Sequence, residues 1–218
     1  MQIQELYQLY LQHPEICTDS RKIVKGSIFF ALKGENFNGN KFAEKVVNNG
    51  CAFAVIDEKE FSKNENFILV EDVLQCLQEL AKYHREQLRI PVIAITGTNG
   101  KTTSKELISA VLSKELNVAA TKGNLNNHIG VPLTLLSIKQ EDEIAIIEMG
   151  ANHEGEIEKA FQLIDAAKES GVDAIKFQNY TASKLTTKTA PKYWDDGVEN
   201  ESQFDVFNKL DKLHDDEW

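Results

Sequence analysis

The chain has 218 residues, of which 42% are hydrophobic and 27% are charged, and this composition is typical of one large or two small globular domains. The formal net charge of −10 argues against nucleic acid or an anionic membrane surface as the main partner. Three widely spaced cysteines without metal-binding spacing, no signal-peptide pattern and no apolar run long enough to span a bilayer predict a cytoplasmic, non-membrane protein with free thiols.

The first ninety residues predict a small α/β domain. Ile3, Leu6, Tyr7 and Tyr10 recur at helical spacing, and a later apolar face contains Val73, Leu77, Leu80, Ala81 and His84. The expected helices are 2–12, 38–50 and 71–88, and the expected strands are 26–32, 52–57 and 66–72. This alternation is typical of βαβ units, and we expect the domain to end near Arg89. His84 on such a face indicates packing rather than chemistry.

Residues 90–157 predict part of a second, parallel-sheet domain. Expected strands are 91–96, 117–121 and 142–150, and a helix is expected over 101–116 with Leu107, Ile108, Val111 and Leu112 facing inward. Further along the chain, the patterns predict a helix over 157–170, a strand over 172–178 and a helix around 202–213.

The stretch "AITGTNGKTTSKE" carries the strongest chemical signal. A strand leads into Gly97, Thr98, Asn99 and Gly100, and a helix then starts at about Lys101. Glycines let backbone N–H groups approach an anion, and the start of a helix adds partial positive charge. Lys101 is expected to reach the β- and γ-phosphates of a nucleotide, and the hydroxyl of Thr102 or Thr103 to ligate Mg²⁺. The pattern departs from GxxxxGK[ST] because Ile95 occupies the place of the first glycine.

Glu148 ends a predicted strand of the same sheet. A carboxylate at the carboxyl end of a parallel strand, close to a phosphate loop, is typical of a metal ligand. A solvated strand end is the alternative interpretation.

"TGTNGKTT" resembles the nucleotide loop of the Mur ligases, ATP-dependent amide-forming enzymes of peptidoglycan synthesis. "TDSRKIVKGSIFFALKGENFNGNKF", "TKGNLNNHIGVPLTLL" and "EMGANHEGEI" extend the resemblance over about residues 1–157. They are similar to the branch of the family that adds D-Ala-D-Ala to UDP-N-acetylmuramoyl-tripeptide.

The resemblance implies a role for each matching position. Asp19, Ser20 and Arg21 would lie near the UDP-linked substrate, Gly97 to Thr103 would hold ATP, and Thr102 and Glu148 would bind Mg²⁺. Asn126 and Asn127 would lie beside the γ-phosphate and the substrate carboxylate. With Lys101, Asn127 and Glu148 in catalysis, the implied reaction forms an acyl phosphate, which an amine then attacks.

The resemblance ends after Ile157, before the family's histidine metal ligand, carbamylated lysine and C-terminal domain. Residues 144–218 instead resemble the opening of the N-acetylneuraminate (sialic acid) synthase family, through "EMGANHEGEI" and the strand ending "KFQ". These enzymes condense phosphoenolpyruvate with an amino sugar in a TIM barrel. In that interpretation Glu148, Asn152, Lys176 and Gln178 lie at the ends of two barrel strands and contact substrate.

The expected fold class is therefore α/β in three parts. They are a substrate-binding domain at 1–89, a partial ATP-binding domain at 90–157 and a barrel-like βα fragment at 158–218, with 144–157 as a shared junction. Three hypotheses stay open: an ATP-dependent ligase, a sugar-acid synthase, and a chimeric fragment that binds nucleotide without turnover. The third is expected for this polypeptide, because the family's further metal ligands and dipeptide-binding domain are missing. Residues 158–218 are not expected to fold stably, unless the strand at 172–178 joins the sheet that starts at 91.

Overall fold

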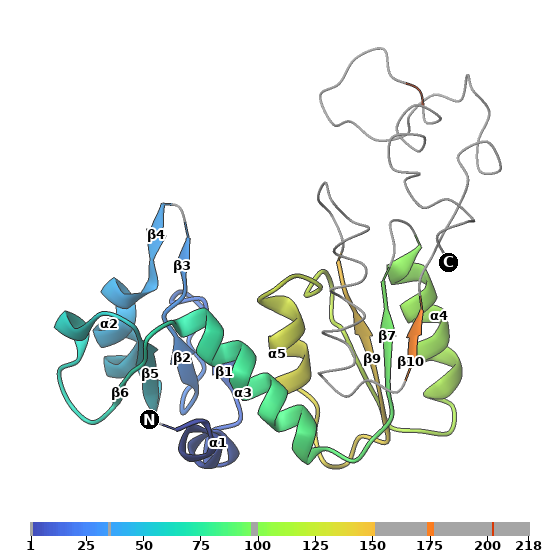
Figure 1. Ribbon diagram of the computed structural model, residues 1–218, viewed down its shortest axis with the longest axis horizontal. Coiled ribbons are helices and arrows are strands. Elements are labelled where there is room, and N and C mark those ends of the chain that lie inside the picture. Colours follow the sequence, from blue (N-terminus) through green and yellow to red (C-terminus); the bar gives the residue numbers. More distant parts are fainter. Residues whose placement is uncertain (1, 35, 97–99, 151–173, 177–201, 203–218) are drawn as a thin grey trace.

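The computed structural model describes residues 2–34, 36–96, 100–150, 174–176 and 202 (Figure 1). It confirms the predicted α/β class, with two parallel sheets of four strands. No helix in these residues is long and apolar enough to cross a membrane.

The N-terminal sheet is parallel, and its strand order is β1-β2-β5-β6. The strands are β1 (Ile16–Cys17), β2 (Ile28–Phe30), β5 (Phe53–Ile56) and β6 (Phe67–Leu69). All three residues of β2 are fully buried, because helices or loops cover both faces of a central parallel strand. The predicted strands are confirmed with shorter bounds, while β1 was not predicted since two residues carry no periodic signal.

Helices α1 (Ile3–Gln12) and α3 (Val73–Gln87) confirm the predicted long helices, and Asp72 caps α3 by accepting the Gln75 N–H at 2.7 Å. The predicted helix at 38–50 is a 3-10 turn, η1 (Gly39–Phe42), followed by α2 (Ala43–Asn48). A second 3-10 turn, η2 (Lys59–Phe61), precedes β6. The thiols of Cys17, Cys51 and Cys76 are free and buried, as expected.

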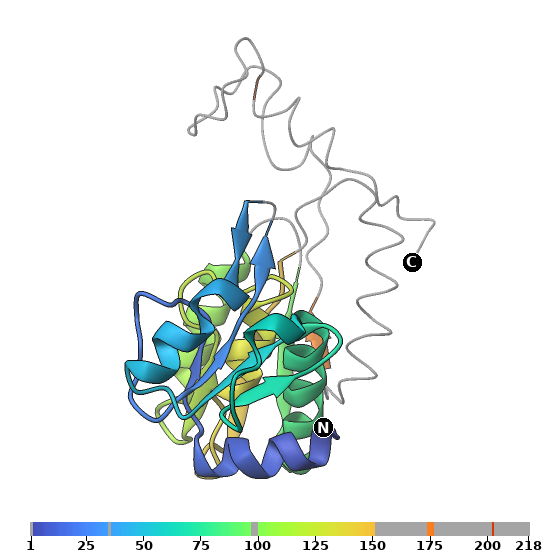
Figure 2. The same ribbon diagram turned by 90° about the vertical axis from the view of Figure 1, so that its left-hand side faces the viewer.

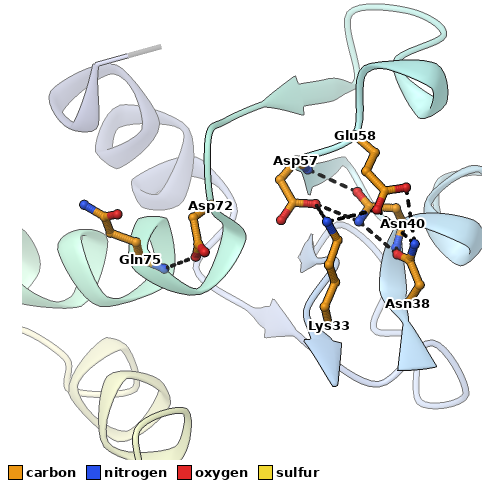
Figure 3. Close-up of polar contacts among 7 residues, drawn as sticks. All are labelled: Lys33, Asn38, Asn40, Asp57, Glu58, Asp72 and Gln75. Carbon is orange, nitrogen blue, oxygen red and sulfur yellow. Dashed lines mark hydrogen bonds and ion pairs between the residues drawn. The ribbon is translucent and has the colours of Figure 1, made fainter. Parts of the chain in front are cut away.

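A short hairpin, β3 (Lys33–Gly34) and β4 (Phe37–Asn38), projects beyond the N-terminal sheet, at the opposite end from α1 (Figures 1 and 2). A polar network holds its base to the end of β5 (Figure 3). Lys33 Nζ lies 2.9 Å from both Asp57 Oδ1 and Glu58 Oε1, and Asn40 Nδ2 donates to Asp57 Oδ1 at 2.8 Å. The Lys33 side chain is 43% exposed while that of Asp57 is 10% exposed, so the hydrogen bonds to Asp57 are better shielded from water than the lysine itself.

The second sheet is also parallel, with the order β10-β7-β9-β8. Its strands are β7 (Val92–Ile95), β8 (Val118–Ala120), β9 (Ile144–Glu148) and β10 (Ala174–Lys176). The pairing of β10 with β7 confirms that part of the predicted strand at 172–178 joins this sheet. The predicted helices at 157–170 and 202–213 lie outside the described residues, apart from Ser202, which forms an isolated bridge.

Helix α4 (Lys101–Leu112) follows the loop after β7, and the predicted orientation of this helix was wrong in part. Leu107 and Val111 are 64% and 70% exposed rather than buried. The inward row instead contains the buried Lys101 and Lys105, with Ile108 and Leu112 partly buried. Hydrophobicity alone placed the stripe on the wrong side, because two buried lysines occupy inward positions and one of them, Lys105, donates to the Thr121 carbonyl.

Helix α5 (Gly130–Leu136) was not predicted. Pro132 falls in its first turn, where backbone N–H groups have no acceptor within the helix. Proline is tolerated there, because the N–H that it lacks would not have been used. The helix packs against α3 and β9.

One buried cluster joins the two sheets across the predicted boundary near Arg89. It includes side chains from α1, α3, α5 and β9, among them Tyr10, Leu80, Leu136 and Ile147. The Tyr10 hydroxyl donates to the Leu136 carbonyl at 2.5 Å. The two α/β parts are therefore packed together rather than separated by an exposed linker.

His84 lies where the two α/β parts pack together. Its Nε2 is 3.0 Å from the Ile138 carbonyl and its Nδ1 is 3.1 Å from the Tyr7 hydroxyl. Since a carbonyl can only accept, Nε2 carries the proton and Nδ1 accepts from Tyr7. The contacts agree with the expected packing role.

Burial lowers the pKa of His84 from its ordinary value, although the hydrogen bond to Ile138 acts the other way. The unfolded chain takes up a proton near pH 6.5 while the folded chain does not, so this contribution to stability is complete above about pH 6.5 and is lost below it. Relative to a His84→Gln variant, wild type is expected to lose up to about 1.4 kcal/mol per pH unit as pH falls below 6.5. Urea unfolding at several pH values measures this difference, and exposed His128→Gln is the control.

Candidate functional site

The site begins where β7 ends. Thr96 follows the strand and is 1% exposed, and its hydroxyl has no hydrogen-bond partner within residues 2–34, 36–96, 100–150, 174–176 and 202. Gly97, Thr98 and Asn99 lie outside the described residues. Gly100 has a φ of 69°, a left-handed conformation that favours glycine, and it caps α4. The predicted strand and the predicted helix start are therefore confirmed on either side of residues 97–99.

Lys101 is the first residue of α4 and is 9% exposed. The N–H groups of a first helical turn have no acceptor within the helix, so they favour an anion in front of them. A cation at the same helix end is unfavourable for the helix itself. An anion that met both the backbone N–H groups and Lys101 would remove this conflict.

Glu148 closes the other side of the site. It ends β9 opposite Ile95 of β7 and is 1% exposed. Its Oε1 accepts from Thr102 Oγ1 at 3.2 Å and from Asn126 Nδ2 at 2.9 Å. Its Oε2 is buried and has no hydrogen-bond partner among the described residues.

The donor set fits a magnesium ion. A buried carboxylate oxygen that no N–H or O–H satisfies is unfavourable unless a cation or a further donor meets it. The Thr102 hydroxyl and the Glu148 carboxylate are oxygen ligands of the kind that Mg²⁺ prefers, with phosphate oxygens and water completing its shell. Thr102 and Thr103 are both exposed on the first turn of α4, and Thr102 is the one whose hydroxyl contacts Glu148.

The two asparagines before α5 have different surroundings. Asn126 contacts Glu148 through its side chain, and its carbonyl accepts the Gly150 N–H at 2.6 Å. Asn127 Oδ1 instead accepts the Ile129 and Gly130 N–H groups at 3.1 and 2.8 Å, and so holds the start of α5. The structure therefore joins Asn126, rather than Asn127, to the Thr102–Glu148 pair.

Asp19, Ser20 and Arg21 form a turn after β1, in the N-terminal part. Arg21 Nε and Nη2 donate to the two Asp19 oxygens at 2.8 and 2.9 Å. This hydrogen bonding lowers the pKa of Asp19 to about 2. Ser20 is buried, while the Arg21 side chain is 85% exposed. Within the described part of the chain, no hydrogen bond or ion pair links this turn to Glu148, so its role stays a prediction.

The residues of the synthase interpretation are only partly described. Asn152 and Gln178 lie outside the described residues. Lys176 ends β10 and pairs with Ile95, which pairs on its other side with Glu148. The ends of β10, β7 and β9 therefore lie in one row beside the loop.

Three family models match the chain. Residues 14–85 match the Mur ligase family, catalytic domain, and residues 95–172 match the Mur ligase middle domain. The N-terminal and middle parts of this chain are homologous to Mur ligases of the MurF type. The NeuB family matches residues 163–218, and it overlaps the Mur match over ten residues, 163–172.

Curated relatives support this homology. UDP-N-acetylmuramoyl-tripeptide–D-alanyl-D-alanine ligase from Bacillus subtilis is 45% identical over 145 residues, 66% of this chain and 32% of that protein. The Escherichia coli ligase of the same name is 43% identical over 142 residues, 65% of this chain and 31% of that protein. The chain thus spans about a third of the length of the curated relatives it matches.

Solved Mur ligases share the fold. The D-alanyl-D-alanyl ligase from Acinetobacter baumannii is similar with a TM-score of 0.65 at 38% identity, over 76% of this chain and 36% of that one. MurF from Thermotoga maritima, solved with ADP, gives a TM-score of 0.64 at 27% identity, over 77% of this chain and 38% of that one.

Proposed function

We propose that the chain up to about residue 157 is the nucleotide- and UDP-substrate-binding part of a ligase that adds D-Ala-D-Ala to UDP-N-acetylmuramoyl-tripeptide in the cytoplasm. The observation that carries this proposal is the convergence of Thr102 and Asn126 on the buried Glu148, directly beside the start of α4. A relative solved with ADP supports the nucleotide.

The proposed reaction has two steps. A substrate carboxylate oxygen attacks the γ-phosphorus of ATP and ADP leaves; an amine then attacks the acyl carbon, loses a proton and displaces phosphate. Lys101 and the N–H groups at the start of α4 are assigned to the phosphates, where they offset charge and align the γ-phosphoryl group. Thr102 and Glu148 are assigned to Mg²⁺, which neutralises phosphate charge when bound.

Substrate positions follow from the same homology. We assign Asp19, Ser20 and Arg21 to the UDP-linked substrate, and Asn126 and Asn127 to the surroundings of the γ-phosphate. The contact of Asn126 with Glu148 supports its place beside the metal. The Asn127 side-chain oxygen is used at the start of α5, which leaves its amide nitrogen for a substrate oxygen.

Nucleotide binding is tested by thermal unfolding with ATP and Mg²⁺. At 100 times the dissociation constant, ATP is expected to stabilise the folded chain by about 2.7 kcal/mol. Lys101→Ala removes a charged hydrogen-bond donor worth about 1.5–3 kcal/mol, so the ATP concentration needed for the same shift should rise about 10- to 100-fold. Exposed Lys114→Ala, on the turn after α4, is the matched control. An unchanged ATP response in Lys101→Ala would contradict the assignment of the loop.

A second function is favoured by the NeuB match at 163–218. Under it, the chain joins a Mur ligase head to the opening of a sialic acid synthase-like protein, with the boundary in 144–157 and Lys176 and Gln178 facing substrate. Assays of ADP release with UDP-N-acetylmuramoyl-tripeptide and D-Ala-D-Ala, and of phosphoenolpyruvate condensation with an N-acetyl amino sugar, separate the three hypotheses. We expect nucleotide binding without either turnover, and ADP release would support the complete ligase reaction instead.

A further inference from the structure

Lys105 is a buried lysine that the nucleotide site does not use directly. It lies one turn beyond Lys101 on α4, and its side chain is 2% exposed. Its Nζ donates to the Thr121 carbonyl at 2.7 Å and lies 2.9 Å from Glu106 Oε1. Burying an ammonium group is unfavourable unless its partners hold it, so this contact fixes α4 to the residue after β8.

Thr121 extends the pairing of β8 with β9 by one residue. The last residues paired between the two strands are Ala120 and Ile146. The Thr121 N–H then donates to the Ile146 carbonyl at 3.0 Å. Its Oγ1 accepts the Glu148 N–H at 2.8 Å, and the residue is 2% exposed. Thr121 therefore contacts Lys105 with its carbonyl and Glu148 with its hydroxyl.

Together these contacts form a chain of hydrogen bonds from α4 through Thr121 to the end of β9. The helix that starts with Lys101 and Thr102 is tied through Lys105 to Thr121, and Thr121 is tied to the backbone of Glu148. The direct contact between Thr102 and Glu148 is longer, at 3.2 Å. The buried residues Lys105 and Thr121 therefore help to set the distance between the start of α4 and the Glu148 carboxylate.

We propose that Thr121 and Lys105 are positioning residues that hold the Glu148 carboxylate at the place where it meets a nucleotide-bound metal ion. The inference rests on the proposed nucleotide function and adds two residues to it. Without the Thr121 hydroxyl, the Glu148 N–H loses its acceptor inside the protein, and the strand end shifts or frays to find another. Metal affinity should suffer, while phosphate binding by the loop should not, because Lys101 and the helix N–H groups stay in place.

The test compares Thr121→Val, which keeps the shape and removes the hydroxyl, with Thr121→Ser, which keeps the hydroxyl. Thermal unfolding is followed with ADP at increasing Mg²⁺ and with ADP in EDTA. Thr121→Val is expected to raise the Mg²⁺ concentration for half of the stabilisation about tenfold and to leave the shift in EDTA unchanged. Thr121→Ser should stay within about twofold of wild type.

A second measurement needs neither metal nor nucleotide. Amide hydrogen exchange at Glu148, followed by NMR, should be faster in Thr121→Val and close to wild type in Thr121→Ser, because the buried acceptor is lost only in the first. Lys105→Met, which keeps an apolar stem, is expected to move the Mg²⁺ dependence in the same direction and carries the test if Thr121→Val does not fold.

The outcomes separate the two proposals. A wild-type chain whose stability does not respond to ADP with Mg²⁺ would overturn the nucleotide function. A wild-type response combined with an unchanged Mg²⁺ half-point in both Thr121→Val and Lys105→Met would overturn the positioning role alone.

Discussion

Replacing Gly130 by alanine is expected to lower the free energy of unfolding by about 2–3 kcal/mol, a fall in Tm of about 5–10 °C. A Cβ at this position would lie 2.4 Å from the Leu125 carbonyl carbon and 2.5 Å from its Cα. These are backbone atoms, so no side-chain rotation relieves the clash. The turn from Leu125 to Gly130 would have to open, although alanine is intrinsically the better helix former by about 1 kcal/mol.

The same change should weaken the response to ATP and Mg²⁺. The turn that would open carries Asn126, whose amide holds Glu148 Oε1. Thermal and urea unfolding measure the stability, and an ATP titration with Mg²⁺ measures the site. Gly34→Ala is the matched control, because a Cβ there meets nothing within 4 Å, and its effect should stay within about 0.5 kcal/mol. Equal stability of the two variants would show that the turn adapts without loss.

Glu148→Gln is expected to abolish the difference between ATP with Mg²⁺ and ATP in EDTA, while the metal-free chain becomes more stable by about 1–3 kcal/mol. The carboxylate is 1% exposed and its Oε2 has no hydrogen-bond partner in the part of the chain that the structure describes, so without a cation the charge is expected to destabilise the folded state. Glutamine keeps an oxygen for Thr102 and Asn126 but is neutral. If this prediction holds, Glu148 lowers the stability of the metal-free chain in return for binding a cation.

Urea unfolding in EDTA and thermal shifts with ATP and Mg²⁺ measure the two halves of this prediction. Glu115→Gln, at an exposed position after α4, should change neither. A Glu148→Gln variant that is less stable in EDTA and still responds to Mg²⁺ would place the metal ligand elsewhere.

Several elements could be predicted from the sequence because their signals are local. The strand before Gly97 and the helix at Lys101 follow one another within ten residues, and the structure contains both. The face of α3 with Leu77 and Leu80 follows from helical spacing, and the structure buries both. Glu148 was recognised as the end of a strand near the loop, and the register with Ile95 places it there.

Other features could not be predicted because their causes lie far apart in the chain. The inward face of α4 depends on Lys105 finding the Thr121 carbonyl, so an apolar stripe through Leu107 and Val111 gave the wrong side. Helix α5 is short and contains a proline, and it is stabilised by α3 and β9 rather than by its own pattern.

The sequence by itself determined the α/β class and the parallel strands, since hydrophobic period is a property of neighbouring residues. It also predicted the phosphate-loop chemistry, from glycine placement and lysine position within one short stretch. Only the tertiary structure decided that Thr102 and Asn126 meet on Glu148, that Thr121 and Lys105 stand behind it, and that β10 pairs with β7. These contacts join residues from separate strands and helices. Each polar group could bond to many partners, and its actual partner is fixed only when the strands and helices pack together and bury it.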